Sequence, residues 1–410
     1  MFKQNNKRNM MKTFYRIYQG IMKVAMNFVP YNKPKVYYGE EATREMSQDI
    51  AEIHKNILLV TDAGVRRLGL INSALAALSQ NGVEVAVFDK VNANPTIKNV
   101  EDGLKAYESS GSTAIIAIGG GSAIDCAKLI GARANNPNKS VRQMRGIMKL
   151  RHALPPLFAV PTTSGTGSET TLAAVVIDSH TKEKFAVMDP KLVPKFAVLD
   201  PNMTLSLPPH LTASTGMDAL THAIESFVGR SNTHETKEYA TNATKLIFEN
   251  LETAFLKPFD MKARQNMMIA SFEAGLAFTR AYVGNVHAIA HTLGGEYNVA
   301  HGLANAIILP KVLSFYGEKI YKKIGTLCNE INLFPELVTN EEKTLAFIQK
   351  IKDMNKLFGF PQYIEELKEE DIPKLVRRAK KEANPLYPVP VIFMDEEFGY
   401  IFHSLLAPKK

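Results

Sequence analysis

The stretch TAIIAIGGGSAIDCAK, residues 113–128, gives the strongest indication of the fold. Residues 114–118 form a short β-branched run typical of a buried strand, which leads directly into three glycines, Ser122 and a helical apolar pattern. Such a turn makes an anion site, because glycine lets the backbone approach a diphosphate and the helix N-terminus offers free N–H groups. A tight turn without a ligand explains the same residues, and the usual G-x-G-x-x-G is missing. Other parts of the chain must therefore show whether this turn binds a dinucleotide.

Outside this stretch, short β-branched runs alternate with helical patterns from about residue 56. The runs lie at residues 56–62, 83–89, 113–119, 157–163, 174–178, 185–188 and 196–200. This alternation predicts a parallel sheet with crossover helices. After residue 206 long helical patterns replace the strand signal, at residues 211–228, 237–256, 262–278 and 342–358. We therefore expect an α/β N-terminal domain with a parallel Rossmann-like sheet, residues 36–205, and an all-α metal-binding domain, residues 206–410.

The composition is that of an ordinary globular protein of two domains, with 410 residues, 45% hydrophobic and 22% charged. The net charge of +8 belongs to residues 1–39, which hold eight Lys and Arg and no acidic residue. The rest of the chain is formally neutral, which argues against a nucleic-acid-binding body. The only cysteines, Cys126 and Cys328, cannot build a disulfide framework, so we expect a reducing cytoplasm.

Residues 1–35 form a basic N-terminal extension with an amphipathic helical pattern. Apolar side chains recur at Phe14, Ile17, Ile21, Ala25 and Phe28, and another face carries Lys12, Arg16, Gln19 and Lys23. The pattern favours a surface helix that docks on the body or on a second subunit. Loose attachment to an anionic membrane surface is the alternative.

Two further features agree with a dinucleotide. Asp62 ends the first strong strand-like run, where dinucleotide folds place an acid on the adenosine ribose, and its carboxylate would favour NAD over NADP by repelling a 2′-phosphate. Asp62 could equally cap the helix that follows. The polar loop PTTSGTGSE, residues 161–169, follows another strand, and its hydroxyls could bind phosphate or ribose oxygens or only satisfy one another.

Metal-binding residue types gather between residues 218 and 301. Asp218 and His222 are four residues apart in a helical pattern, His287 and His291 repeat this spacing, and His301 follows. A spacing of four places both side chains on one helix face. Three imidazoles and a carboxylate suit Fe(II) or Zn(II), and five candidates for four positions leave one imidazole that could relay a proton.

Such a site predicts a reaction class. A divalent metal that binds an alcohol or carbonyl oxygen acidifies the alcohol or polarises the carbonyl, so that hydride can pass to or from C4 of a nicotinamide.

These residues resemble the iron-containing (group III) alcohol dehydrogenases, the group of lactaldehyde reductase and 1,3-propanediol dehydrogenase. The resemblance covers nearly everything after residue 35 and rests on residues 119–128, 161–169 and 216–225, and on His287-x3-His291-x9-His301-Gly302. It implies the dehydroquinate synthase-like fold of iron alcohol dehydrogenases and an NAD(H)-dependent enzyme acting on a small alcohol or aldehyde. It also implies the metal ligands Asp218, His222, His287 and His301, and leaves His291 as the catalytic imidazole.

The resemblance carries over a set of cofactor-binding positions as well. They are Asp62, Asn94, Gly120, Gly121, Ser122, Asp125, Thr162, Thr163, Thr166 and Lys184. Phe278 matches a pocket-lining aromatic. On the approach to the metal, where the family often has Asn and small residues, this chain has Arg280, Tyr282 and Asn285 instead. Arg280 is either an external salt-bridge residue or a group that favours a substrate with a carboxylate or several hydroxyls.

Several alternatives stay open. The metal could be zinc, with polyol oxidation like that of glycerol dehydrogenase. A lyase resembling dehydroquinate synthase would need more Lys and Arg for a phosphate than residues 210–305 provide. A non-catalytic binding protein would be expected to lose a ligand, and none is lost. We expect a homodimer or higher homo-oligomer and no nucleic-acid partner.

Overall fold

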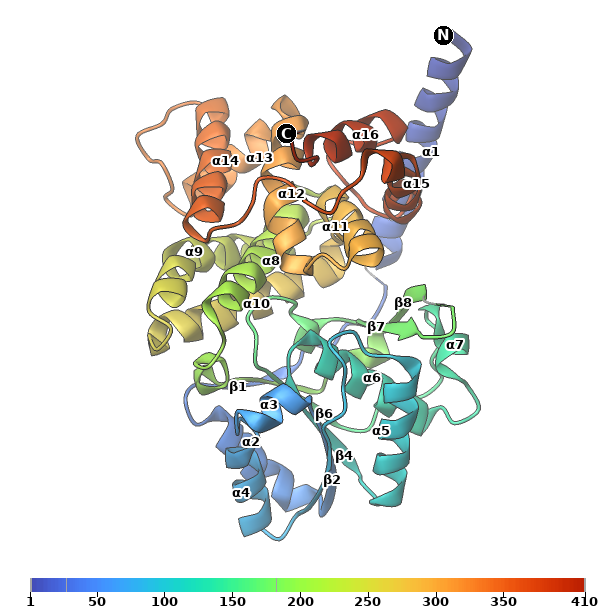
Figure 1. Ribbon diagram of the computed structural model, residues 1–410, viewed down its shortest axis with the longest axis vertical. Coiled ribbons are helices and arrows are strands. Elements are labelled where there is room, and N and C mark those ends of the chain that lie inside the picture. Colours follow the sequence, from blue (N-terminus) through green and yellow to red (C-terminus); the bar gives the residue numbers. More distant parts are fainter. Residues whose placement is uncertain (1, 27, 182, 409–410) are drawn as a thin grey trace. The chain divides into compact units, whose positions relative to one another are not determined.

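The structure is a computed structural model that describes residues 2–26, 28–181 and 183–408, with side chains from residue 8 onward (Figure 1). The chain forms two compact units. The sheet unit comprises Pro30–Thr212 and Leu256–Leu276, and the helical unit comprises Met1–Val29, Ala213–Phe255 and Ala277–Lys410. The two units are defined by their internal contacts and each combines several chain segments. They therefore do not test the domain boundaries predicted at residues 35 and 205, which remain predictions.

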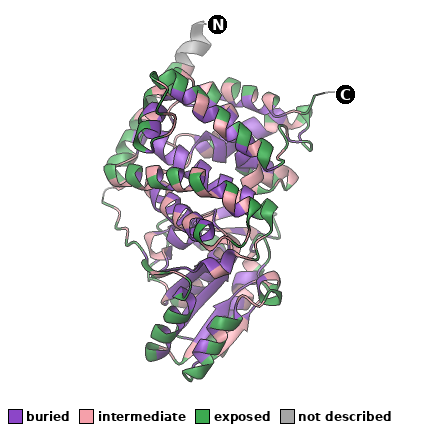
Figure 2. Cartoon of the chain, turned by 90° about the vertical axis from the view of Figure 1, so that its left-hand side faces the viewer, coloured by how far each residue is buried: buried purple, intermediate pink, exposed green. Residues whose placement is uncertain are grey.

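The sheet unit is built on six parallel strands. Their order is β1 (Lys35–Tyr38), β9 (Phe196–Leu199), β6 (Leu157–Pro161), β4 (Ala114–Gly119), β2 (Asn56–Val60) and β3 (Glu84–Phe88). All six residues of β4 are buried, because this strand lies inside the sheet and is covered on both faces. Figure 2 shows the inner strands of the sheet largely in the purple of buried residues. The parallel sheet predicted from the alternating pattern is confirmed.

Each face of the sheet has its own apolar core. Successive side chains of a strand point to opposite faces, so Ile115 and Ala117 join one core and Ile116 and Ile118 join the other. The first core includes side chains of α5 (Ile97–Ser109) and α6 (Gly121–Asn135). The second includes side chains of α2 (Ala42–Ile53) and α4 (Asn72–Gln80). The short α3 (Ala63–Arg67) follows β2.

A smaller sheet takes up two of the predicted strand runs. Its strand order is β5 (Gly146–Ile147), β8 (Glu183–Met188) and β7 (Ala173–Asp178), and β7 and β8 pair antiparallel. The short α7 (Val141–Met144) precedes β5. Three 3₁₀ turns complete the unit, η1 (Ser168–Thr170), η2 (Pro190–Leu192) and η3 (Pro201–Thr204). An apolar run in the sequence does not reveal which strand it pairs with. The runs at residues 174–178 and 185–188 therefore could not be assigned to a second sheet from the sequence.

The second half of the chain is helical, as predicted, and no strand is assigned in the described residues after Leu199. The helices are α8 (Pro209–Val228), α9 (His234–Leu256), α10 (Met261–Ala281), α11 (Asn285–Tyr297), α12 (His301–Tyr316), α13 (Glu318–Glu330), α14 (Asn340–Leu357), α15 (Ile372–Ala383) and α16 (Asp395–Ser404), with η4 (Glu369–Asp371) before α15. None of the described helices has both the length and the apolar character that a membrane crossing requires.

The basic N-terminal helix α1 (Phe2–Met26) docks on the helical unit through a face that mixes polar and apolar side chains. On this face Met11 and Tyr15 pack against the small apolar cluster of Val389, Ile392 and Met394. Arg8 pairs with Glu396 and Glu397, and Lys12 pairs with Glu397. Further along, α1 bonds to backbone carbonyl oxygens of the helical unit. The Arg16 guanidinium donates to those of Val389 and Pro390, the Gln19 amide to those of Pro385 and Tyr387, and the Lys23 ammonium to that of Arg230. The helix therefore turns much of its apolar face outward.

Candidate metal centre and cofactor loops

The structure brings together the four residues predicted as metal ligands. Asp218 and His222 project from α8 four residues apart, His287 comes from the first turn of α11, and His301 begins α12. One potential ligand atom from each of the four lies within 4.8 Å of all the others. Asp218, His222 and His287 are buried, and His301 is partly exposed. Helical spacing thus produces a compact cluster of one carboxylate and three imidazoles.

The contacts in the cluster suit a cation. Asp218 Oδ1 lies 3.3 Å from His301 Nε2 and 3.7 Å from His287 Nε2. Burial alone would raise the pKa of Asp218, but the neighbouring His301 and His222 and the hydrogen bonds outweigh it and hold that pKa well below its ordinary value. Asp218 therefore stays ionised and supplies a negative charge in a buried place, where a charge must be paired or bind a metal.

Glu225 orients His287 from behind. Its carboxylate lies 2.7 Å from His287 Nδ1 and accepts from the backbone N–H groups of Gly284 and Val286, each also at 2.7 Å. Burial lowers the pKa of His287, but the hydrogen bonds to Asp218 and Glu225 outweigh it and raise that pKa to about 9. A carboxylate on Nδ1 is the usual partner of a metal-binding imidazole, because it fixes the ring with Nε2 toward the metal.

The position of Asn305, one turn after His301 on α12, bears on whether the four residues fit a metal ion. Its amide nitrogen lies 2.7 Å from Asp218 Oδ1 and 3.2 Å from the Nε2 atoms of both His287 and His301. An electropositive N–H₂ group thus sits where these electron-pair donors converge. Its Oδ1 is buried and finds no hydrogen-bond partner among the described residues. The donor set is one that Fe(II) and Zn(II) accept, so the residues fit a divalent metal.

His291 lies beside the cluster but outside it. Its ring stacks on that of His301 at 5.0 Å, and its Nδ1 lies 2.6 Å from Glu382 Oε1. The Tyr387 hydroxyl donates to the same oxygen at 2.9 Å. The side chain of His291 is 41% exposed, against 2% for His287. The fifth imidazole therefore has a carboxylate partner and access to solvent.

Phe278 and the three departures from the family pattern lie near these residues in sequence and differ in their contacts. The Phe278 ring stacks on His222 at 4.1 Å. Asn285 donates to the Tyr316 hydroxyl and the Val391 carbonyl oxygen, which is a structural use of its amide. Arg280 donates to the Met26 carbonyl oxygen at the end of α1, and Tyr282 adopts a positive φ of 68°. Among these four residues, Phe278 contacts a predicted metal ligand, and this contact suits a residue that lines a substrate pocket.

In the sheet unit, the glycine turn joins β4 to α6 as predicted. Gly120 is the N-cap of α6, and Gly121 begins the helix. A Cβ atom at Gly121 would lie 2.8 Å from Thr166 Oγ1, so only glycine allows this approach between the turn and the loop of residues 161–169. Thr163 lies next to Gly120. The Thr162 backbone N–H donates to the Gly119 carbonyl oxygen at 3.0 Å. The two polar loops therefore lie side by side.

The other predicted cofactor residues have contacts of their own. Asp62 is the N-cap of α3, and its Oδ1 accepts from the N–H groups of Gly64 and Val65, so the capping alternative holds for that oxygen. The Lys184 ammonium donates to Asn94 Oδ1 at 3.2 Å. The Ser122 hydroxyl donates to the Ala93 carbonyl oxygen.

Asp125 and Lys128 join α6 to the segment that follows the second loop. Asp125 is bonded through one oxygen to the Ser168 hydroxyl at 2.6 Å and through the other to the Val175 N–H at 3.0 Å. The buried Lys128 ammonium donates to the carbonyl oxygens of Thr171 and Ala173. Burial lowers the pKa of Lys128 to about 8 despite the nearby acidic groups. These contacts give Asp125 a positioning role beside any contact with a cofactor.

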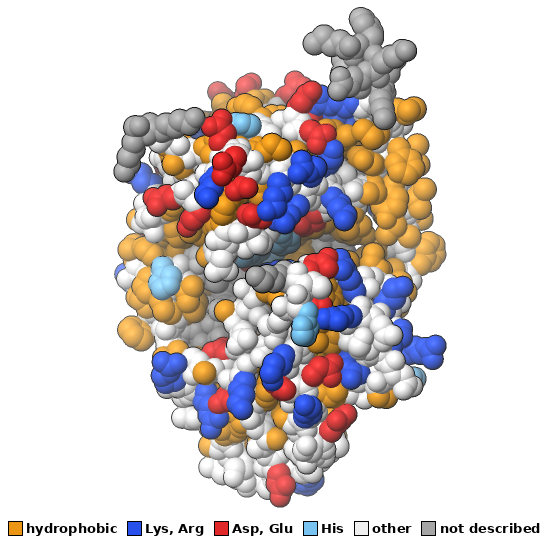
Figure 3. Space-filling model, turned by 45° about the vertical axis from the view of Figure 1, so that its right-hand side comes forward, with side chains coloured by type: hydrophobic (Ala, Val, Ile, Leu, Met, Phe, Trp, Pro, Cys, Tyr) orange, Lys and Arg blue, Asp and Glu red, His pale blue; other side chains and the backbone are white. Residues whose placement is uncertain are grey.

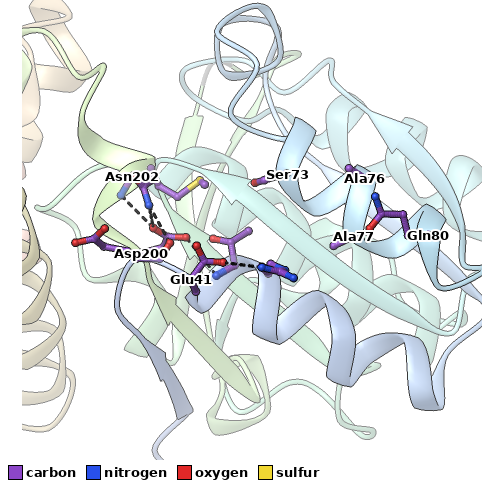
Figure 4. Close-up of a pocket in the computed structure, with 11 residues that line it drawn as sticks. Glu41, Ser73, Ala76, Ala77, Gln80, Asp200 and Asn202 are labelled. Carbon is purple, nitrogen blue, oxygen red and sulfur yellow. Dashed lines mark hydrogen bonds and ion pairs between the residues drawn. The ribbon is translucent and has the colours of Figure 1, made fainter.

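The sheet unit also has a separate polar pocket (Figure 4). It has a volume of about 500 Å³ and is lined by residues of α2, α4 and the η3 turn. Asp200 accepts there from the backbone N–H groups of Thr43 and Asn202, and Glu41 pairs with Arg44. None of the predicted cofactor residues lines it.

Sequence reasoning missed four residues of the site, Glu225, Asn305, Glu382 and Tyr387. Two of them had a local signal, since Glu225 follows His222 by three positions and Asn305 follows His301 by four, each on the face of a predicted ligand. Glu382 and Tyr387 lie about ninety residues beyond His291, and no pattern in the sequence joins them to it.

Comparison with known proteins agrees with this geometry. The family model described as "Iron-containing alcohol dehydrogenase" matches residues 33–201, and "Fe-containing alcohol dehydrogenase family, C-terminal" matches residues 212–406. The chain is 38% identical to 1,3-propanediol dehydrogenase of Klebsiella pneumoniae over 80% of this chain and 86% of that protein. It is 33% identical to lactaldehyde reductase of Escherichia coli strain K12 over 84% of this chain and 90% of that protein.

A solved structure extends the comparison to the cofactor. Sulfoacetaldehyde reductase of Bifidobacterium kashiwanohense, in complex with NAD⁺, superimposes with a TM-score of 0.82 at 28% identity, covering 93% of this chain and all of that one. The predictions of an oxidoreductase with NAD and a divalent metal as cofactors agree with these relatives. Because the two family models together match nearly the whole chain, the chain belongs to the iron-containing alcohol dehydrogenase family.

Proposed function

We propose that this enzyme transfers a hydride between NAD(H) and a small alcohol or aldehyde, with Asp218, His222, His287 and His301 holding the divalent metal. The observation that carries the proposal is the approach of four potential ligand atoms to within 4.8 Å of one another. A divalent metal there supplies Lewis-acid activation of an alcohol or carbonyl oxygen, and the nicotinamide accepts or gives the hydride.

The side chains around the ligands have distinct tasks. Glu225 holds the His287 ring through a 2.7 Å hydrogen bond to Nδ1, so that Nε2 remains available for the metal. Asn305 donates to Asp218 Oδ1 at 2.7 Å in the structure and keeps that carboxylate in position. The Phe278 ring covers one face of His222 and offers an apolar surface to a small substrate.

His291 is the group that moves the substrate proton. Its Nδ1 lies 2.6 Å from Glu382 Oε1, a contact that orients the ring, and the side chain is 41% exposed. A proton accepted from an alcohol can therefore pass from His291 to water. In aldehyde reduction the same imidazole returns a proton to the product oxygen.

The cofactor is assigned to the two loops of the sheet unit. The glycine turn 119–121 and the N-terminus of α6 suit a diphosphate, and Thr162, Thr163 and Thr166 offer polar groups beside it. Asp62 still has its Oδ2 for a ribose hydroxyl, because both backbone donors of its cap bind Oδ1. That assignment favours NAD over NADP, since a 2′-phosphate would face a carboxylate.

The relatives suggest the size of the substrate. Proteins named for 1,3-propanediol and lactaldehyde, both of three carbons, match this chain over more than three quarters of its length. The Arg280 guanidinium donates a hydrogen bond to the Met26 carbonyl oxygen. This contact favours a structural role for Arg280 over recognition of a substrate carboxylate. We therefore favour a small uncharged alcohol or aldehyde as the substrate.

Location and assembly are part of the proposal. Cys126 and Cys328 are free and buried, as expected of an enzyme from a reducing cytoplasm. We also propose that the enzyme works as a homodimer or a higher homo-oligomer.

An NADH-consumption assay over a panel of small aldehydes tests the function, with anaerobic enzyme supplied with Fe(II), Zn(II) or chelator. We expect turnover with metal, loss with chelator, and a loss of at least a hundredfold in His301→Ala but not in His234→Ala, whose histidine is 90% exposed on α9. Restoration by Zn(II) and not by Fe(II), with preference for polyols, would favour the glycerol dehydrogenase-like alternative. A metal-loaded enzyme without turnover on any substrate would favour a binding protein.

A further inference from the structure

The helix α1 exposes a continuous apolar stripe. Six of the ten exposed large apolar side chains of the helical unit's described residues lie on α1 or directly after it, each 58–82% exposed. They are Met10, Phe14, Ile17, Ile21, Val24 and Phe28. Figure 3 shows hydrophobic side chains gathered on the right-hand side over this helix. Single exposed apolar residues are ordinary on protein surfaces, whereas a contiguous row marks an interaction site.

The stripe has the spacing of a coiled-coil seam. Its positions follow one another in steps of four, three, four, three and four residues. This is the repeat that keeps apolar side chains of one helix facing a partner helix. Phe28 follows α1, and its backbone N–H donates to the Ala25 carbonyl oxygen at 3.0 Å.

We propose that this stripe binds the α1 helix of a second copy of the chain in an antiparallel pair. The spacing is symmetric about residue 19. Under a twofold axis at that point Met10 faces Phe28, Phe14 faces Val24 and Ile17 faces Ile21 of the other copy. A surface that is complementary to itself under a twofold axis is what a symmetric dimer requires.

Gly20 lies on the same side of the helix as the stripe. It forms a shallow hollow together with Ile17, Ile21, Val24 and Ala25, and a Cβ atom at Gly20 would meet nothing within 4 Å. A hollow of this kind can accept an apolar side chain of a facing helix. The two copies together bring twelve large side chains, and at roughly 100 Å² of apolar surface for each one the contact would bury on the order of 1,200 Å², the lower end of the range for specific interfaces.

The charges of α1 favour a protein partner over a lipid surface. A helix that lies on an anionic membrane presents free cations beside its apolar face. Arg8, Lys12, Arg16 and Lys23 are the only Lys and Arg among the described side chains of α1, and all four are bonded to the helical unit. Burial lowers the pKa of Arg16 to about 10, so it remains a cation at neutral pH, held in place by the unit.

Dilution experiments on the full chain test the pair. Ile17→Asp combined with Ile21→Asp should raise the dissociation constant of the assembly at least tenfold, measured by sedimentation velocity, because four carboxylates would meet at the axis. The matched control, Val338→Asp with Leu345→Asp, places two charges on exposed apolar positions of the same unit and should leave that constant unchanged. Melting curves by circular dichroism check that both variants are folded.

Cross-linking tests the register. Copies carrying Ile17→Cys, mixed with copies carrying Ile21→Cys, should join through a short bis-maleimide far more than either variant alone, and the two native cysteines are buried. An unchanged dissociation constant, or cross-linking no stronger in the mixture, overturns the proposal. The stripe would be assigned to lipid instead if two results came together. The unmodified chain would sediment with phosphatidylserine vesicles and the double aspartate variant would not, while the dissociation constant of the assembly stayed the same in both.

Discussion

Replacing Glu225 by Gln should weaken metal binding without removing any ligand. The Glu225 carboxylate accepts three hydrogen bonds of 2.7 Å, from His287 Nδ1 and from the backbone N–H groups of Gly284 and Val286. A glutamine has one acceptor oxygen and one N–H₂ group, so at least one of these three donors would face another donor. The backbone donors cannot move away, and we expect the His287 ring to turn.

The size of the effect follows from the bond that is lost. A hydrogen bond to a charged group contributes about 1.5–3 kcal/mol, against about 1 kcal/mol for a neutral one. Loss of a carboxylate behind a metal-binding histidine usually lowers metal affinity about 10–100-fold, or about 1.4–2.7 kcal/mol. We expect a loss in this range for Glu225→Gln, and a smaller one for Glu225→Asp, which keeps the charge.

The measurement is a competitive titration of metal-free enzyme with a chromogenic chelator, under anaerobic conditions for Fe(II) and in parallel for Zn(II). Glu249→Gln, the same change at an exposed position of α9, serves as the control. Melting curves of the metal-free proteins separate a local change from unfolding. A dissociation constant within threefold of that of the unmodified enzyme, in a folded variant, would refute the role assigned to Glu225.

Three further changes test other parts of the enzyme. Glu382→Gln removes the carboxylate 2.6 Å from His291 Nδ1, and we expect kcat to fall about 10–100-fold with little change in the affinity for NADH, measured by stopped-flow reduction; an equal loss of both would indicate general damage. Gly121→Ala places a Cβ atom 2.8 Å from Thr166 Oγ1 and should raise the dissociation constant for NADH about tenfold in a fluorescence titration, whereas unchanged binding would remove the turn from the cofactor site. Burial raises the pKa of Glu169 from 4.5 to about 7, so the folded state holds a proton that the unfolded state has lost, and stability should fall as the pH rises from about 4.5 through 7, by at most about 3 kcal/mol. Chemical denaturation at pH 5 and pH 8 should show this fall in the unmodified chain and not in Glu169→Gln; the same fall in both would contradict it.

Those parts of the fold that depend on local pattern could be predicted from the sequence. The strand in residues 113–119 appears as β4 (Ala114–Gly119), and the glycine turn follows it as expected. The edge strand β1 (Lys35–Tyr38) could not be predicted, because its four residues are mostly exposed and show no buried run. Pairing between β7 and β8 also depends on contacts that an apolar run does not encode.

The orientation of α1 shows a different limit. The sequence predicts a helix with an apolar and a basic face, and hydrophobic burial alone would favour docking by the apolar face. In the structure the face with the basic side chains docks instead, because the helical unit offers those side chains Glu397 and the carbonyl oxygens of residues 385–390. The same face also packs Met11 and Tyr15 against a small apolar cluster of the unit. Those partners lie more than 360 residues away along the chain. Only the folded unit reveals which face is occupied and which remains open.

His287 and His291 show how one pattern yields two roles. They lie one helical turn apart on α11, and each has a carboxylate on Nδ1, Glu225 at 2.7 Å and Glu382 at 2.6 Å. Their chemistry is therefore alike, and exposure distinguishes them, at 2% for the side chain of His287 and 41% for that of His291. A buried imidazole held against a carboxylate suits a metal, because the hydrogen bond to Nδ1 fixes the ring and leaves the Nε2 lone pair to bind the metal. An exposed imidazole with the same support suits proton exchange with solvent, and we infer that burial, not residue type, makes His291 the relay.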